Sequence, residues 1–125
     1  MLEVAAMPGF LAWRAEEPVG LITYEILGDA CEITVLLSVV EKIGVGSALI
    51  GAVKEMARQA GCHRLWLITT NDNTPALRFY QRRGFTLAAL HVNALEYSRR
   101  LKPEIPLIGL DGIPLRDEIE LEMPL

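Results

Sequence analysis

The sequence has few of the side chains that bind metals or form disulfides. Its 125 residues include two cysteines, Cys31 and Cys62, and two histidines. Two cysteines that lie far apart in sequence give neither a disulfide framework nor a zinc-type spacing. We therefore expect reduced thiols, no bound metal and a cytoplasmic location.

Long apolar runs are also missing. No segment approaches the ~20 consecutive apolar residues of a membrane-spanning helix, and residues 1–10 lack the basic start of a signal peptide. No membrane association is expected. Hydrophobic residues make up 51% of the chain, which excludes global disorder. The length predicts one domain over residues 1–125.

The chain has fewer basic than acidic residues, and its net charge of −4 argues against general nucleic-acid binding. The charges are nevertheless unevenly placed, because nine basic and three acidic residues lie between Lys54 and Lys102. A basic middle suits a small polyanion, and acidic flanks suit a cationic substrate. The alternative is that these charges are the solvated faces of surface helices.

Residue patterning predicts a mixed α/β fold. Turn residues separate strands at 10–15, 20–27 and 31–40, which indicates an antiparallel meander. Alternation on the third strand places Ile33, Val35, Leu37 and Val39 on one face and Glu32, Thr34, Leu36 and Ser38 on the other.

The following segment alternates helices and strands. An apolar stripe predicts a helix over 46–60 that Gly61 ends. Asn73 is expected to cap a second helix, and Asn93 with Glu96 is expected to form a capping box for a third. The further predictions are strands at 64–70, 85–92 and 118–123, helices at 74–83 and 94–101, and a loop over 103–116. The last strand is expected near a sheet edge.

We divide the domain into an N-terminal segment (1–9), a core (10–92), a helix and loop (93–116) and a final strand (117–125).

A glycine-bearing turn, Glu41-Lys42-Ile43-Gly44-Val45-Gly46, joins the third strand to the first helix. Backbone N–H groups at such a helix N-terminus form a concavity that suits a phosphate or diphosphate. Glycine permits close approach of the ligand or a positive φ. The alternative is a plain entry turn into the helix.

This turn and a second block resemble the GNAT superfamily of acyl-CoA-dependent N-acetyltransferases. The family signature is Gln or Arg, two free positions, Gly, one free position, and Gly or Ala. Gly44 and Gly46 match it, whereas Glu41 replaces the leading residue and Lys42 the glycine that commonly follows. The second block, Asn73-x-x-Ala76-x-x-x-Tyr80-x-x-x-Gly84-Phe85, matches without a gap. The resemblance covers about residues 10–92.

The resemblance implies a mostly antiparallel central sheet with flanking helices and a splayed parallel pair of strands, 36–40 beside 66–70, that holds pantetheine. It implies acetyl-CoA as co-substrate. The expected cofactor-binding residues are Leu37, Ser38, Val39, Ile43, Gly44, Val45, Gly46, Ser47, Asn73, Ala76, Phe79 and Tyr80.

The resemblance also implies direct attack on the thioester by an amine of a small molecule or peptide. A backbone N–H near Leu37 would stabilise the oxyanion, and Tyr80 would protonate the leaving thiolate. Glu32 would act as base, directly or through water. The alternative for Tyr80 is a structural role, in which its hydroxyl hydrogen-bonds a backbone carbonyl. The alternative for Glu32 is an ordinary solvated carboxylate at the end of a strand. Cys31 has no histidine near it in sequence, so a cysteine nucleophile is not expected.

Other functions stay open at this point. The family normally has helices before the strand at 10–15, and here only nine residues precede Phe10. Residues 94–116 or a second subunit would then cover that side of the acceptor site, so a homodimer is one expectation. Glu41, Lys42 and the short N-terminus favour an acyl-CoA-binding sensor or regulatory module. A different nucleotide-binding domain is disfavoured, because the chain has neither a GxGxxG fingerprint nor a Walker lysine.

Overall fold

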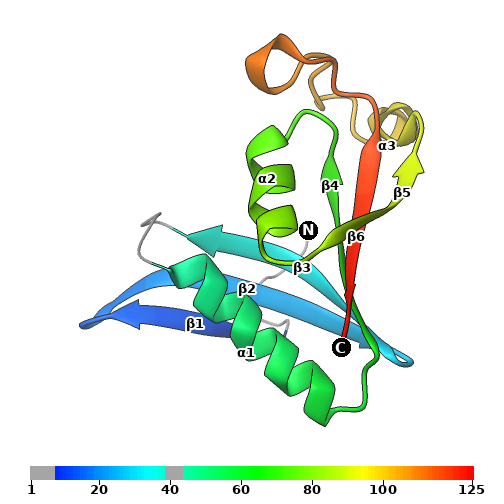
Figure 1. Cartoon of the computed structure of the whole chain (residues 1–125). Helices are drawn as coiled ribbons and strands as arrows, with labels where there is room; N and C mark the ends of the chain where they lie inside the picture. The colour runs from blue at the N-terminus through cyan, green and yellow to red at the C-terminus, as the bar shows by residue number, and fades with distance from the viewer. Residues whose placement is uncertain (1–7, 39–43) are drawn as a thin grey trace. The chain divides into compact units, whose positions relative to one another are not determined.

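The computed structural model describes residues 8–38 and 44–125 (Figure 1). Its strands follow the order β1-β2-β3-β4-β6-β5, and β3 and β4 are parallel in a mostly antiparallel sheet, which confirms the expected fold class. The chain forms two compact units, which are the described part of Met1–Trp66 with Pro124–Leu125, and Leu67–Met123. The elements are β1 Gly9–Arg14, β2 Glu17–Leu27, β3 Ala30–Ser38, α1 Val45–Gln59, β4 Arg64–Thr70, α2 Thr74–Arg82, β5 Thr86–His91, α3 Ala94–Leu101, the 3-10 turn η2 Leu110–Gly112 and β6 Glu118–Pro124.

The first unit is the antiparallel meander β1-β2-β3 with helix α1 packed on it. Its first turn comes one step earlier than expected, because Ala15 adopts a positive φ of 55° and β2 already begins at Glu17. Helix α1 lies close to β2 at Gly20, where an added Cβ would stand 2.5 Å from Val45 Cγ1. Glycine is therefore required at this contact. The buried side chains of α1 are Val45, Leu49, Ile50, Val53 and Ala57.

A β-bulge in β3 changes which side chains share a face. Thr23 of β2 pairs with Val35, whereas the next residue, Tyr24, pairs with Ile33, so Thr34 is the extra residue. Directly paired residues in an antiparallel sheet share a face. The face covered by α1 thus carries Gly20, Ile22, Tyr24, Ile26, Cys31, Ile33, Leu36 and Ser38. The opposite face carries Leu21, Thr23, Glu25, Glu32, Val35 and Leu37.

The strict alternation predicted for β3 is therefore wrong. Ile33 and Leu37 lie on opposite faces, and Glu32 lies on the same face as Leu37. The physical reason is that one unpaired residue interrupts the alternation, so that every side chain before it in the strand lies on the opposite face from the one predicted. A hydrogen bond of 2.7 Å between the Thr23 and Thr34 hydroxyl groups accompanies the bulge.

In the second unit, β6 lies between β4 and the edge strand β5, so it is near a sheet edge as predicted but is flanked on both sides. The chain leaves β5, passes through α3 and returns to pair antiparallel with β5. The two flanking strands explain why Leu121 and Met123 are buried and why the glutamates of β6 are only half-exposed. Strand β5 is the strand at that end of the sheet order.

The start of α3 also differs from its prediction. Asn93 adopts a left-handed conformation (φ 63°) and its side chain caps nothing in the helix, so the predicted capping box is wrong. The backbone N–H of Asn93 donates instead to Asp117 Oδ1 at 2.9 Å. A tertiary contact thus supplies the acceptor that local capping was expected to provide. No helix in the described part of the chain is long and apolar enough to span a membrane.

Replacing Leu121 should destabilise the protein more than replacing an exposed leucine. Leu121 is completely buried, so Leu121→Ala leaves a cavity that costs about 2–5 kcal/mol. Leu101, the matched control on α3, is 87% exposed, and Leu101→Ala should cost less than about 0.5 kcal/mol. Urea unfolding at neutral pH measures both values, and equal costs would contradict the placement of β6 between β4 and β5.

Candidate active site

Helix α1 of the first unit begins at Val45, directly after Gly44 of the predicted phosphate-binding turn. Gly44 precedes the helix with a φ of 80°, a conformation that L residues rarely adopt. The first helical hydrogen bond runs from Ala48 N–H to Gly44 O at 2.9 Å, so the N–H groups of Val45 and Gly46 precede the helical ladder. No acidic side chain occupies the first turn. The helix end can therefore face an anion.

Gly44 and Gly46 have different structural roles. An added Cβ at Gly44 would meet nothing within 4 Å, so glycine is needed there for its backbone conformation. Gly46 lies inside α1 and is half-buried, so a positive φ does not explain why glycine occupies this position. Glu41, Lys42 and Ile43 of the predicted turn lie outside the described residues, and so does Val39, the cofactor-binding residue expected near the end of the third strand.

Leu37 and Ser38, two further predicted cofactor-binding residues, point to different faces of β3. Leu37 pairs with Leu21 on the face opposite α1 and is 58% exposed. Ser38 pairs with Gly20 on the α1 face, close to the helix start, and is half-buried. The expected oxyanion donor near Leu37 stays a prediction.

Glu32 has an acidic neighbour that sequence patterning did not indicate. Glu32 is half-buried in β3 and pairs directly with Glu25 of β2. Paired residues share a face, so both carboxyl groups lie on the side of the meander opposite α1. Two adjacent negative charges attract a cation. Only the register between β2 and β3 identifies Glu25 as the neighbour of Glu32, because the bulge at Thr34 shifts this pairing by one residue.

In the second unit, the block Asn73 to Phe85 builds helix α2 and its two ends. Asn73 caps the helix as predicted, since its Oδ1 accepts from Ala76 N–H at 3.2 Å. Gly84 ends it with a φ of 98°, and Phe85 N–H returns to Tyr80 O at 3.1 Å. Phe85 is thereby turned into the core against Tyr80, with ring centroids 5.4 Å apart.

Tyr80 is held as a neutral phenol. Its side chain is 8% exposed and lies edge-on to both Phe79 and Phe85. Burial raises the pKa of Tyr80 to about 12, although the nearby positive charge of Arg83 lowers it in part. Arg83 is itself held over the Phe79 ring at 3.5 Å. The hydroxyl therefore carries its proton throughout the neutral pH range and is available as a hydrogen-bond or proton donor.

Cys31 has the opposite character to a nucleophile. It is fully buried, and burial first, then Cys62 and Glu32, raise its pKa to about 11. The thiolate form is therefore scarce at neutral pH. Within the described ranges, no three His, Cys, Asp or Glu side chains form a metal-binding group.

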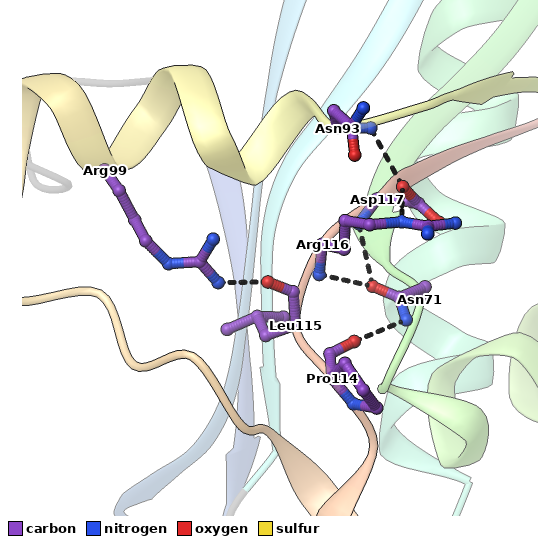
Figure 2. A network of polar contacts seen from close by, with 7 residues as sticks. All are labelled: Asn71, Asn93, Arg99, Pro114, Leu115, Arg116 and Asp117. Carbon is purple, nitrogen blue, oxygen red and sulfur yellow. Dashed lines mark hydrogen bonds and ion pairs between the residues drawn. The ribbon is translucent and has the colours of Figure 1, made fainter.

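A polar network follows β4 directly and was not predicted (Figure 2). Asn71 Oδ1 accepts from the N–H groups of Arg116 and Asp117, at 3.1 and 2.9 Å, and its Nδ2 donates to Pro114 O at 2.9 Å. The Arg116 guanidinium donates to both Asp117 oxygens at 2.8 and 2.9 Å. The pKa of Asp117 is lowered by hydrogen bonding to the Arg116 side chain, by the hydrogen bond from Asn93 N–H and by the charge of Arg116, although desolvation opposes them. Asn71 and Arg116 are 45 residues apart in sequence, so no local pattern could indicate this contact.

Comparison with known proteins identifies the fold and its relatives. The model of the acetyltransferase (GNAT) family matches residues 2–85. YdhI, an uncharacterized protein of Bacillus subtilis, is 53% identical over 114 residues, which cover 90% of this chain and 71% of YdhI. YxbD of the same organism is 52% identical over 103 residues, or 82% of this chain and 65% of YxbD.

Solved structures agree with this fold. A GNAT family acetyltransferase from Elizabethkingia anophelis with acetyl-CoA bound matches with a TM-score of 0.83 and 23% identity, over 98% of this chain and 78% of that one. A Bacillus subtilis acetyltransferase in complex with CoA matches with a TM-score of 0.79 and 24% identity, over 92% and 74%.

The high pKa of Tyr80 predicts a resolved step in an alkaline titration. A folded-state pKa near 12 lies above the ordinary value of 10, so Tyr80 stabilises the fold below pH 10 and this stabilisation is lost as the pH rises toward 12. Absorbance at 295 nm should show one tyrosine that ionises near pH 12, and Tyr80→Phe should remove that step. Its persistence in Tyr80→Phe would contradict the assignment, and Tyr97→Phe, on an exposed tyrosine, is the matched control.

Proposed function

Because the chain belongs to the GNAT acetyltransferase family, we propose that it transfers an acetyl group from acetyl-CoA to a primary amine by direct attack. The observation that carries this proposal is Tyr80, a buried and protonated phenol at the family position of the general acid. The block around it supports the role, since the helix is capped at Asn73 and ended at Gly84.

Acetyl-CoA would bind with its diphosphate at the N-terminus of α1. The N–H groups of Val45 and Gly46, together with the helix dipole, favour two negative charges there. Two of the structural neighbours have CoA or acetyl-CoA bound, which supports this choice of co-substrate. Ile43, Gly44 and Ser47 would supply further N–H groups of the same turn, and Ser38 and Val39 would lie along pantetheine. The cofactor arm would also contact Asn73, Ala76, Phe79 and Tyr80.

The reaction requires three events at the thioester. The amine nitrogen attacks the carbonyl carbon, and an oxyanion forms that a backbone N–H near Leu37 would stabilise. The carbon–sulfur bond then breaks, and the departing thiolate takes the Tyr80 proton. The nitrogen, which carries a positive charge after the attack, loses one proton, and this proton returns to the tyrosinate through solvent, so that the products are a neutral amide and a free thiol. Burial keeps the phenol protonated at neutral pH, so the proton is present for donation, whereas a pKa near 12 makes Tyr80 a weaker acid than an exposed tyrosine.

Glu32 would accept the proton that the ammonium form of the acceptor must lose before attack. Its carboxylate and that of Glu25 share the face of the meander not covered by α1. Two adjacent carboxylates favour a cationic acceptor. We propose Glu32 as the base and Glu25 as a residue that attracts the ammonium group.

Removing the Tyr80 hydroxyl should lower turnover without loss of cofactor binding. We expect Tyr80→Phe to reduce kcat by about a hundredfold, because general acid catalysis contributes at least that much. The assay follows CoA thiol release with acetyl-CoA and a panel of primary amines, and calorimetry gives the acetyl-CoA affinity. Tyr97→Phe, on the exposed tyrosine of α3, should match the wild type.

Two outcomes would change the proposal. Unchanged turnover in Tyr80→Phe would remove Tyr80 as general acid. No thiol release by the wild type across the panel, together with tight acetyl-CoA binding, would favour the alternative of an acyl-CoA sensor or regulatory module.

A bulky residue at Gly46 should abolish cofactor binding. Gly46 is the second residue of α1, where a branched side chain would stand in front of the N–H groups that face the diphosphate. Gly51→Val is the matched control, because Gly51 lies in the same helix with open space around it. Calorimetry should show more than about a hundredfold weaker acetyl-CoA binding for Gly46→Val alone. Equal affinities would overturn the assigned phosphate site.

A further inference from the structure

Arg83, the residue that follows α2, differs from the other arginines of this segment. Arg78 and Arg82 are exposed, whereas Arg83 is half-buried. Its guanidinium carbon lies 3.5 Å from the centre of the Phe79 ring, and its Nη1 donates to Phe79 O at 2.9 Å. The backbone N–H of Arg83 donates to Tyr80 O at 3.0 Å. These contacts fix both the backbone and the side chain of Arg83 relative to Phe79 and Tyr80.

The end of the helix explains this arrangement. The last carbonyl groups of a helix lack partners from a following turn, and a basic side chain there can bond to them and interact favourably with the helix dipole. Arg83 follows Phe79 by four residues, so both side chains lie on the same side of the helix. The guanidinium group can therefore stack on the Phe79 ring and bond to the Phe79 carbonyl at the same time.

This position brings the charge of Arg83 close to the Tyr80 phenol. The Phe79 and Tyr80 rings lie edge to face, with their centres 5.1 Å apart. Because the two distances add, the guanidinium carbon lies within about 9 Å of the Tyr80 ring centre, a range over which a charge acts where water is partly excluded. Burial raises the pKa of Tyr80 to about 12, against the positive charge of Arg83, which lowers it.

Among the described residues, the charge that acts on the Tyr80 phenol is that of Arg83. The ring neighbours of Tyr80 are phenylalanines, which carry no charge. Helix α2 packs on β5, whose single ionisable side chain, His91, lies 3.3 Å from Glu120. Arg82 is exposed, so water screens its charge.

Proton donation gives the Arg83 charge a chemical role. When Tyr80 donates its proton, a negative tyrosinate forms on a side chain that is only 8% exposed. A charge that develops where water is scarce is stabilised by a fixed charge of opposite sign. Arg83 supplies such a charge, and its contacts with Phe79 hold it in place before the reaction. Arg83 occupies a free position of the block from Asn73 to Phe85, so the resemblance assigns it no role.

We propose that Arg83 is a positioning residue for catalysis: held by the ring and carbonyl of Phe79, its guanidinium stabilises the Tyr80 tyrosinate that forms as the leaving thiolate takes the proton. The inference rests on the proposed acetyl transfer and adds a residue to it. Arg83 acts through Tyr80, so its charge matters in the transition state and not in the binding of acetyl-CoA. Removal of the charge should therefore lower kcat and leave the KM for acetyl-CoA unchanged.

Substitutions that separate charge from hydrogen bonding test this role. Arg83→Gln keeps a donor for Phe79 O without the charge, and Arg83→Lys keeps the charge. Arg82→Gln, on the exposed neighbour, is the matched control for the loss of one positive charge. Arg83→Gln should lower kcat about threefold, with the KM for acetyl-CoA within about twofold, whereas Arg83→Lys and Arg82→Gln should stay close to the wild type.

Titration of Tyr80 provides a readout that needs no turnover. A fluorinated tyrosine, incorporated at all three tyrosine positions, lowers the phenol pKa values into a range in which the protein stays folded, and fluorine NMR follows each position separately. The Tyr80 signal is assigned by its loss in Tyr80→Phe. Arg83→Gln should raise the pKa of the fluorinated Tyr80 by about 0.5–1, and Arg83→Lys and Arg82→Gln should leave it in place.

A double variant tests whether Arg83 acts through Tyr80. No tyrosinate forms in Tyr80→Phe, so adding Arg83→Gln to this variant should not lower its kcat further. An equal loss of kcat in the wild-type and Tyr80→Phe backgrounds would overturn the proposal, because Arg83 would then act elsewhere.

The outcomes separate the two proposals. Acetyl transfer with an unchanged Tyr80 pKa in Arg83→Gln would overturn the role of Arg83 and leave the proposed function standing. A raised Tyr80 pKa in Arg83→Gln, without acetyl transfer by the wild type, would reject the enzyme activity and retain Arg83 as the residue that stabilises the ionised phenol. Equal losses of kcat in Arg83→Gln and Arg83→Lys would identify the contacts with Phe79 as purely structural and overturn the role of the charge as well.

Discussion

Side chains of a β-strand alternate between two faces, so the extra residue at Thr34 decides the arrangement of the whole first unit. The bulge lets Cys31 and Ile33 enter the core under α1 together with Leu36. It also places Glu32 on the opposite face, where it meets Glu25. Without the bulge, a carboxylate would face the helix and the core would lose apolar side chains.

The second unit depends on a different constraint, the short connection Asn71-Asp72-Asn73. Each of these polar side chains satisfies backbone groups of another segment, so one turn orients a helix, a loop and the entry to β6. Polar groups that are buried need such partners. Rigidity around the candidate site therefore comes from directed hydrogen bonds as well as from apolar packing.

The electrostatic settings of the candidate groups explain their chemical roles. Tyr80 is buried among aromatic rings and keeps its proton, whereas the buried Asp72 is ionised because hydrogen bonds outweigh its desolvation. Cys31 is buried without such donors, and its pKa rises. The same degree of burial thus accompanies pKa shifts of opposite direction, depending on the hydrogen-bond donors that surround each group.

Local patterns were sufficient wherever the cause of a feature lies within a few residues. The helix periods, the Asn73 cap and the ends of most elements were predicted correctly because helix hydrogen bonds and caps join near neighbours. The structure of the block from Asn73 to Gly84 could likewise be predicted, since its residues begin, form and end one helix.

The sequence by itself therefore determined the elements, the two blocks and the candidacy of Tyr80 and Glu32. Only the tertiary structure decided the bulge at Thr34, the insertion of β6 between β4 and β5, the pairing of Glu25 with Glu32 and the hydrogen bond from Leu110 N–H to Asp72. Each of these depends on partners distant in sequence. A strand's register and a buried carboxylate's partners are set by which segments meet in space, and periodicity along one segment carries no information about that.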